Sequence, residues 1–278
     1  MAFDAAVTKN QIYKMDILDI GNTGMGIGKI NGFTVFVEGA LPGEEIEVKI
    51  VKVKKSYAFG KMLRIIAPSP WRMKPVCSKF GKCGGCQLMH FEYKKQLEYK
   101  AKKVKDCLER IGGVKDVPFL PPVGMENPSF YRNKAQYPVG GEGGDVKIGF
   151  YSLRSHTIID NDSCYIQNKR NEEIVGAVRE YILENHIPVY DELSQKGIIR
   201  HILTRVGYAT GEIMVCIVVN AKKLPKQDKL IEKLRKIENM TSIVLNINEK
   251  KTNVILGEKI DAVSYTHLKI GRGGEKNG

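Results

Sequence analysis

The feature that most restricts how this chain can fold is a cluster of three cysteines, Cys77, Cys83 and Cys86, with a glycine pair between the last two. Thiolates are soft ligands that suit zinc and iron–sulfur clusters. The two glycines allow the backbone to turn tightly, so that the flanking sulfurs can face a common centre. Three local thiolates need a fourth ligand to close such a site. The spacing therefore predicts that this segment folds around a metal centre.

The fourth ligand is predicted to be Cys164, which lies in a polar stretch far downstream. Cys107 falls near the apolar stripe of a predicted helix and Cys216 falls in an apolar strand, so both are expected to be buried core thiols. His90, soon after the third cysteine, is an alternative fourth ligand and would give a zinc site with three thiolates and one imidazole. The spacing alone leaves iron–sulfur and zinc equally open.

The composition favours a cytoplasmic protein that handles RNA. No apolar run approaches the roughly 18 residues that a membrane-spanning helix needs, and residues 1–10 lack the apolar stretch of a secretory signal. In a reducing compartment, the six cysteines do not indicate a disulfide framework. The net charge of +13 favours a polyanionic partner, and RNA is the commonest one in the cytoplasm. A surface charge that serves solubility is the alternative explanation.

Residues 10–66 contain a series of short strand patterns separated by turns. The clearest is 45–53, where apolar and polar residues alternate strictly, as in a half-buried strand. Several such strands in so short a segment predict a small β-barrel of the OB type. Its polar face is mostly basic, and Lys54 and Lys55 are candidate RNA-binding residues. The glycines in 21–28 predict a hairpin rather than a phosphate loop, because a strand pattern and not a helix follows them.

Residues 67–262 are predicted to form a central α/β region. A proline-rich linker and the cysteine cluster come first, and then a helix over 91–111 with one apolar face and a lysine-rich remainder. Further helices are expected at 168–185 and 227–238, and strands at 133–139, 146–151, 156–160, 199–206, 212–220, 241–248 and 252–256.

Several stretches resemble the RNA uracil-5-methyltransferases, a family of class I enzymes that use S-adenosylmethionine and carry an N-terminal TRAM domain. The most specific is the run from Cys77 to His90, Cys-Ser-Lys-Phe-Gly-Lys-Cys-Gly-Gly-Cys-Gln-Leu-Met-His. Other stretches resemble elements of that family in the same order and spacing over residues 10–262. They are Tyr131-Arg-Asn-Lys134, Asp162-Ser-Cys164, Gly197-Ile-Ile-Arg-His201, Asn246-Ile-Asn248 and Thr252-Asn-Val-Ile-Leu-Gly257.

The resemblance implies a multidomain α+β or α/β protein, with residues 10–66 as an RNA-binding TRAM barrel. It implies that the central region, 67–262, holds a [4Fe–4S] cluster on Cys77, Cys83, Cys86 and Cys164. The family transfers a methyl group from S-adenosylmethionine to C5 of a uridine in 23S rRNA or tRNA, after a cysteine thiolate has added to C6 of the uracil. The target base must be unstacked to reach the pocket.

The same resemblance makes Arg132 and Lys134 candidate RNA contacts, and Arg200 and His201 stand in a similar position. The alternative role of these residues is an ion pair within the central region.

The resemblance ends near Ala262, and residues 263–278 are expected to be an atypical C-terminal tail. The Rossmann-like methyltransferase domain is expected to be absent. We therefore assign no catalytic residue and no residue to S-adenosylmethionine, and expect a monomeric N-terminal part of such an enzyme that is inactive alone. The alternative is a non-catalytic RNA-binding protein with a structural zinc site. A redox enzyme is disfavoured because no flavin or nicotinamide loop is found.

Overall fold

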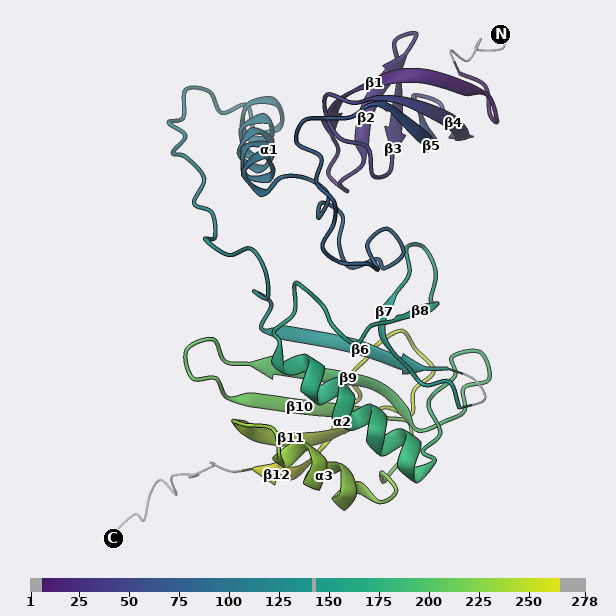
Figure 1. Ribbon diagram of the computed structural model, residues 1–278, viewed down its shortest axis with the longest axis vertical. Helices are drawn as coiled ribbons and strands as arrows, with labels where there is room; N and C mark the ends of the chain where they lie inside the picture. The colour runs from purple at the N-terminus through teal and green to yellow at the C-terminus, as the bar shows by residue number, and fades with distance from the viewer. Residues whose placement is uncertain (1–6, 142–143, 266–278) are drawn as a thin grey trace. The chain divides into compact units, whose positions relative to one another are not determined.

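The computed structural model describes residues 7–141 and 144–265. The chain divides into two compact units, Met1–Pro128 and Ser129–Gly278 (Figure 1). Within the described ranges, no helix is long and apolar enough to cross a membrane.

The first unit begins with a closed barrel, in which the strands follow the order β1-β2-β3-β5-β4. β3 and β5 pair in parallel, and the other neighbours pair antiparallel. In β4, buried Ile46, Val48 and Ile50 alternate with partly exposed residues, as the sequence predicts. They meet Val35 and Val37 of β3 in the barrel core. The strands are β1 (Ile12–Ile20), β2 (Gly26–Ile30), β3 (Phe33–Val37), β4 (Glu45–Val53) and β5 (Tyr57–Ala67).

The glycine-rich segment forms a hairpin, as predicted. β2 pairs antiparallel with both β1 and β3. Gly28 is required there, because a Cβ atom at this position would lie 2.2 Å from the carbonyl oxygen of Asp16 on the neighbouring strand. Gly24, in the turn before β2, has a φ of +81°, which glycine adopts without strain. Gly28 therefore allows β1 and β2 to approach closely, and Gly24 allows the turn between them.

A buried ion pair ties the segment after the barrel to the barrel itself. Glu44, whose side chain is fully buried, accepts hydrogen bonds from Nε and Nη2 of Arg72, the second at 2.9 Å. Its carboxylate also accepts the backbone N–H of Leu41 at 2.8 Å. Nη2 of Arg72 donates in addition to the carbonyl oxygen of Gly39 at 2.6 Å. These bonds fix the chain that leads into the cysteine cluster.

The lysine-rich helix, α1 (Tyr93–Asp106), continues into one π-helical turn, η1 (Cys107–Ile111). The hydroxyl of Tyr99 donates to the carbonyl oxygen of Gly21 at 2.9 Å and so attaches the helix to the barrel. None of the residues of α1 or η1 is buried. The expected burial of Cys107 is therefore wrong, because the apolar stripe of this helix is only partly covered: Leu97 and Leu108 are half-buried, whereas Val104 is exposed.

The second unit contains a seven-stranded sheet in the order β12-β11-β10-β9-β6-β7-β8. β10 and β11 pair in parallel and are joined through α3, whereas the other neighbouring strands pair antiparallel. Its elements are β6 (Lys134–Gly140), β7 (Lys147–Tyr151), β8 (Ile158–Asp160), α2 (Arg170–Asn185), β9 (Ile199–Val206), β10 (Ile213–Val219), α3 (Gln227–Arg235), β11 (Met240–Ile247) and β12 (Lys259–Tyr265).

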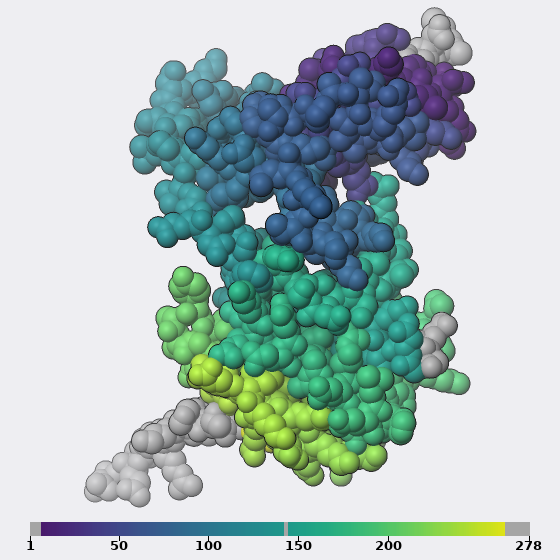
Figure 2. All heavy atoms as spheres, viewed as in Figure 1, coloured from purple at the N-terminus to yellow at the C-terminus, as the bar shows by residue number. Residues whose placement is uncertain are grey.

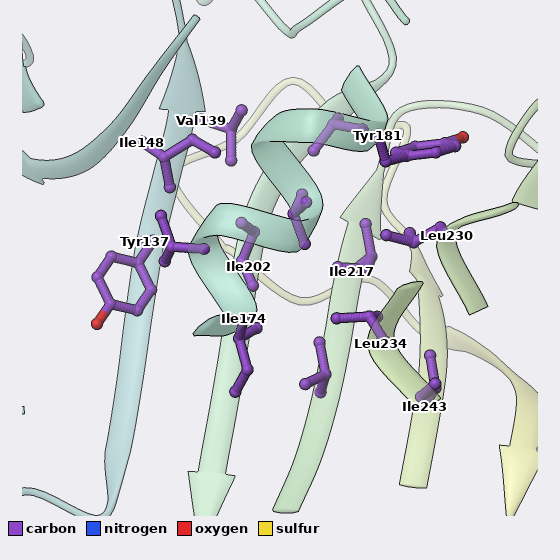
Figure 3. Packing of buried hydrophobic residues seen from close by; sticks show 14 of the residues in the cluster. Tyr137, Val139, Ile148, Ile174, Tyr181, Ile202, Ile217, Leu230, Leu234 and Ile243 are labelled. Atoms are coloured by element: carbon purple, nitrogen blue, oxygen red, sulfur yellow. The ribbon is translucent and has the colours of Figure 1, made fainter. Parts of the chain in front are cut away.

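Helices α2 and α3 cover one face of this sheet (Figure 1). Ile174 of α2 and Leu234 of α3 point toward Ile202, Ile217 and Ile243 of the strands (Figure 3). All five side chains are buried, so this face is the main hydrophobic core of the unit. The two helices lie next to each other on the surface (Figure 2).

The opposite face of the sheet carries a smaller cluster around Leu203, Cys216 and Val244, with Ile255 packed against it. Cys216 is 4% exposed, so its predicted burial is confirmed. Burial raises the pKa of its thiol to about 11, which keeps the group protonated at neutral pH. This thiol is therefore a packing residue.

The connection from β11 to β12 is held by two buried asparagines. Nδ2 of Asn248 donates to the carbonyl oxygens of Val254 and Ile255 at 2.7 and 2.9 Å. Asn246 bonds the backbone N–H and carbonyl of Gly257. The strand expected at 252–256 is therefore wrong, because side-chain amides and not a neighbouring strand bind these backbone groups. The last strand is β12 instead.

The expected fold class needs correction in how the parts divide. It placed the cysteine segment in one central α/β domain with the later strands. In the structure, the cysteines up to Cys86 and helix α1 belong to the barrel unit, and the sheet unit begins at Ser129. The Glu44–Arg72 pair fixes the chain before the cysteines, and the bond from Tyr99 to Gly21 attaches α1. Of the expected tail, 263–265 are part of β12, and 266–278 lie outside the described residues.

Candidate nucleic-acid interface

Three aromatic rings form a cluster on the outside of the barrel. Phe36 of β3 and Phe59 of β5 are register partners, and Tyr57 lies two residues before Phe59 on the same side of β5. The ring of Tyr57 meets Phe36 and Phe59 edge-on, with centroids 5.6 and 5.5 Å apart. All three are partly exposed, whereas the intervening Ala58 is buried. The rings therefore offer a surface on which unstacked bases can lie.

Lysines border this aromatic cluster. Lys54 and Lys55, the predicted RNA-binding residues, are exposed in the turn between β4 and β5, directly before Tyr57. Lys52 is exposed and is the register partner of Phe59 on β4. Positive charge beside exposed aromatic rings is the usual composition of a single-strand-binding surface. We call Phe36, Tyr57, Phe59, Lys52, Lys54 and Lys55 the barrel patch.

A second group of aromatic and basic side chains lies on the other unit, where β6 begins. The ring centroids of Phe130 and Tyr165 are 5.9 Å apart, and Nζ of Lys169 lies 4.7 Å from the centroid of Phe130. Phe130 has a φ of +57°, which is rare for a bulky residue and is held by its backbone bond to Tyr165. Such strained residues concentrate at functional sites.

Arg132 and Lys134 extend this second group. Both are exposed, and neither forms an ion pair within the described part of the chain, so their alternative structural role has no support there. The backbone N–H of Arg132 bonds the carbonyl oxygen of Ile166, which fixes the backbone beside Tyr165. We call Phe130, Arg132, Lys134, Tyr165 and Lys169 the sheet patch.

Arg200 has a structural role instead. It is buried, and its Nη1 donates to the carbonyl oxygens of Asn248 and Lys250 at 2.7 and 2.9 Å. Its guanidinium also lies 4.5 Å from the ring centroid of Tyr190. His201 is buried next to it. Arg200 therefore anchors the β11–β12 connection and is not available as an exposed phosphate contact.

The three clustered cysteines are partly buried on a turn-rich segment. The backbone N–H of Gly85 donates to Sγ of Cys83 at 3.4 Å, and the N–H of Cys83 bonds the carbonyl of Lys79. Cys77 accepts the backbone N–H of Phe80. The donor chemistry suits a soft metal. Within the described residues, however, no group of three or more possible ligands is gathered closely enough to hold a metal ion.

The two candidates for a fourth ligand lie in different surroundings. His90 is 1% exposed, and its Nε2 donates to the carbonyl oxygen of Gly39 at 3.1 Å. Burial and the charge of Arg72 lower the pKa of His90 to about 4, so the ring is neutral at pH 7. Cys164 belongs to the second unit, in the loop before Tyr165. The [4Fe–4S] assignment therefore stays a prediction.

The first comparison with known proteins concerns the barrel. Residues 6–63 match the family model of the TRAM domain. This match covers the barrel strands up to the middle of β5 and includes the barrel patch. The barrel is therefore a TRAM domain.

Most of the chain is similar to curated bacterial proteins named as RNA methyltransferases. It is 50% identical over 260 residues to an uncharacterized RNA methyltransferase of Clostridium tetani. It is 46% identical over 256 residues to another from Halalkalibacterium halodurans. These alignments cover 93% and 92% of this chain and 56% of each relative. The chain thus spans about half the length of the curated relatives it matches.

A solved methyltransferase structure is also similar to most of this chain, at lower sequence identity. The chain resembles the crystal structure of the Pyrococcus abyssi tRNA (uracil-54, C5)-methyltransferase in complex with S-adenosyl-L-homocysteine, with a TM-score of 0.65 and 28% identity. The alignment covers 88% of this chain and 55% of that chain.

This match corrects the expected fold class a second time. We expected a protein defined by the absence of a Rossmann-like methyltransferase domain. Instead, 88% of the chain aligns with the structure of a methyltransferase that binds S-adenosyl-L-homocysteine, and relatives named as methyltransferases match over nearly the whole chain. The expected fold class, which was based on the absence of that domain, is therefore wrong. The expectation that the domain that binds S-adenosylmethionine is absent is wrong for the same reason.

Sequence reasoning found the lysines of the barrel patch but not its aromatic rings. Tyr57 and Phe59 stand two apart in a strand pattern, so their common face could have been predicted from the period of a strand. The partner Phe36 could not, because β3 and β5 are neighbours only once the barrel has closed in parallel. The sequence analysis also missed Phe130 and Tyr165, because these residues lie far apart in the sequence and meet only in the folded second unit.

Proposed function

We propose that this chain binds RNA as an RNA uridine C5-methyltransferase that uses S-adenosylmethionine. The observation that carries the proposal is the barrel patch, in which edge-packed aromatic rings are bordered by exposed lysines on a TRAM domain. The named relatives and the resemblance to a tRNA (uracil-54, C5)-methyltransferase support the methyl-transfer reaction.

In this function the described residues bind and orient the RNA. The lysines of the barrel patch neutralise backbone phosphates, and the rings stack on bases that have left the helix. The sheet patch, with Arg132 and Lys134, contacts a further stretch of the same RNA. S-adenosylmethionine supplies the methyl group for C5 of the uracil. No residue of this chain is assigned to the catalytic step.

The substrate is proposed to be a uridine of tRNA or 23S rRNA. The direct test is to delete the gene in its host and to measure 5-methyluridine in purified tRNA and rRNA by mass spectrometry. The proposal predicts that 5-methyluridine disappears from one position of one of these RNAs and returns when the gene is restored. An unchanged 5-methyluridine content in both RNAs would refute the proposed reaction.

We further propose that Cys77, Cys83, Cys86 and Cys164 bind a [4Fe–4S] cluster with a structural role. Soft thiolate donors support this proposal. The test is the metal content of the protein purified without oxygen. Iron with acid-labile sulfide and a brown colour would support a cluster, and a colourless protein with one zinc would support the alternative zinc site. A protein without metal would refute both.

The protein is also proposed to act as a cytoplasmic monomer, where its RNA substrates are found. Light scattering of the purified protein measures the mass, and a mass of twice the chain would contradict this proposal.

A further inference from the structure

A cavity of about 610 Å³ opens in the second unit between the β7–β8 hairpin, the loop that follows α2, and the start of β9. Its walls include Tyr151, His156, Glu192 and His201. This volume lies in the range of small-ligand sites. The cavity is separate from the sheet patch, whose residues do not line it.

The carboxylate of Glu192 is held in place by two side chains of the cavity. Its Oε1 accepts the hydroxyl of Tyr151 at 2.9 Å, and its Oε2 accepts Nδ1–H of His156 at 2.7 Å. Each oxygen keeps one further lone pair. The Glu192 side chain is 45% exposed, so a ligand can reach both oxygens. Burial raises the pKa of Glu192, but the two hydrogen bonds outweigh burial and lower it, so the group is ionised at neutral pH.

An aromatic surface lies beside this carboxylate. The rings of Tyr151 and His156 are stacked, with centroids 4.8 Å apart and an angle of 26° between their planes. The His156 side chain is 64% exposed, so one side of the stack is open. A flat ligand can therefore extend the stack while its edge meets Glu192.

The back of the cavity holds a polar atom without a partner. His201 is 8% exposed, and its Nδ1 is buried with no hydrogen-bond partner among the described residues. Burial and the charge of Arg200 lower the pKa of His201 to about 4, so it is a neutral ring in the folded protein. Buried polar atoms that remain unpaired cost free energy, and a ligand that bonds this nitrogen would recover it.

The charged side chains that line the cavity favour a nucleobase over a phosphate group as its ligand. The carboxylates of Asp145, Asp191 and Glu192 line the cavity with Lys147 and Arg200. Nζ of Lys147 already pairs with Asp145 at 3.1 Å, and Arg200 is bound to backbone carbonyls. A phosphate would therefore face ionised Glu192, and the only cation without a carboxylate partner among the described lining residues is Arg200, whose sole unpartnered donor is its buried Nε. A neutral ligand with adjacent N–H groups is suited to Glu192 instead.

We propose that this cavity binds an unstacked guanine base of the RNA, with the Glu192 carboxylate accepting N1–H and the N2 amine of its Watson–Crick edge. The proposal rests on the RNA-binding function proposed above. Guanine presents two adjacent N–H donors on that edge, whereas uracil and adenine each present a single donor group there. Proteins read unstacked RNA bases in this way, by hydrogen bonds to the edge and by stacking.

The test is the affinity of the protein for short oligouridines that carry one central guanosine, inosine or adenosine, measured by fluorescence anisotropy. Inosine lacks only the N2 amine. We expect the guanosine oligonucleotide to bind roughly tenfold more tightly than the adenosine one, as for a bidentate base contact, with inosine between them. Comparing the three RNAs on the wild-type protein needs no variant, so the result does not depend on a variant's folding.

Glu192→Gln should remove the preference for guanosine, because the amide offers one acceptor where the carboxylate offers two. Glu184→Gln is the matched control, since Glu184 on α2 pairs with Lys233 and does not line the cavity. Equal affinity of the wild-type protein for all three RNAs would overturn the guanine site and leave the RNA-binding function intact. A failure to bind any of the three would overturn both.

Discussion

The buried pair of Glu44 and Arg72 gives the sharpest stability prediction. Arg72 supplies the Glu44 carboxylate with two hydrogen bonds and its counter-charge. In Arg72→Met, the fully buried carboxylate would keep the backbone N–H of Leu41 at 2.8 Å and that of Ser69 at 3.5 Å. Among its present contacts, the Glu44 carboxylate would then have no positively charged partner. The apolar stem of methionine preserves most of the packing, so the loss is mainly electrostatic.

The expected cost is large for one substitution. Removing one partner of a buried ion pair destabilises a protein by about 3–5 kcal/mol. With a urea dependence of about 2 kcal/mol per M, the unfolding midpoint should fall by about 2 M. Glu44→Leu combined with Arg72→Met should recover part of this loss, because the uncompensated charge is then removed as well.

Urea unfolding, monitored by tryptophan fluorescence, measures this shift of the unfolding midpoint in the first unit alone. Trp71 is the only tryptophan of the chain and lies in that unit. Arg64→Met is the matched control, because Arg64 pairs with Glu47 on the surface at 3.1 Å, with its side chain 61% exposed. That pair should contribute about 0–1 kcal/mol. Equal midpoints for Arg72→Met and Arg64→Met would refute the reasoning.

Three further outcomes are expected. Because the folded pKa of His90 is about 4 and the unfolded value is 6.5, the unfolded state binds more protons between these values, so stability falls as pH drops from about 6.5 to about 4. His90→Gln should weaken this dependence by about 1–2 kcal/mol between pH 7 and pH 5, and an identical pH profile would argue against a neutral His90. Asn246→Ala should destabilise the second unit by about 1–3 kcal/mol in thermal melts, because the backbone of Gly257 loses its partner. Tyr57→Ala with Phe59→Ala should lower affinity for single-stranded RNA by about 1–3 kcal/mol per lost stack, measured by anisotropy, and unchanged affinity would exclude stacking there.

Local patterns in the sequence were enough to predict several elements. The strict alternation over 45–53 gave β4, because a strand with one buried face needs that period. The same reasoning placed β3 at 33–37, and the apolar spacing of 168–185 gave α2 to within two residues of its observed start. These elements carry their own periodicity, so no knowledge of their neighbours is needed.

Features that depend on distant neighbours were not predictable. The apolar stripe of α1 predicted burial, yet Val104 is 55% exposed, because burial depends on what packs against a helix and not on its own pattern. Arg200 resembled an RNA contact, but it holds carbonyls of the β11–β12 connection. The carbonyls of 254–255 bind Asn248, which removed the expected strand. In each case the outcome depends on tertiary contacts that the local pattern does not contain, even where the partner, as for Asn248, is only a few residues away.

The salt dependence of RNA binding tests the central claim most directly. If Lys54 and Lys55 neutralise two phosphates of a single strand, replacing both with alanine should reduce the slope of log Kd against log salt concentration by about 1.4. Lys222→Ala with Lys223→Ala, an exposed pair in the second unit that belongs to neither patch, is the control and should leave the slope unchanged. We predict a smaller slope and weaker binding for the Lys54 and Lys55 variant alone. An unchanged slope would show that the barrel patch does not hold the RNA.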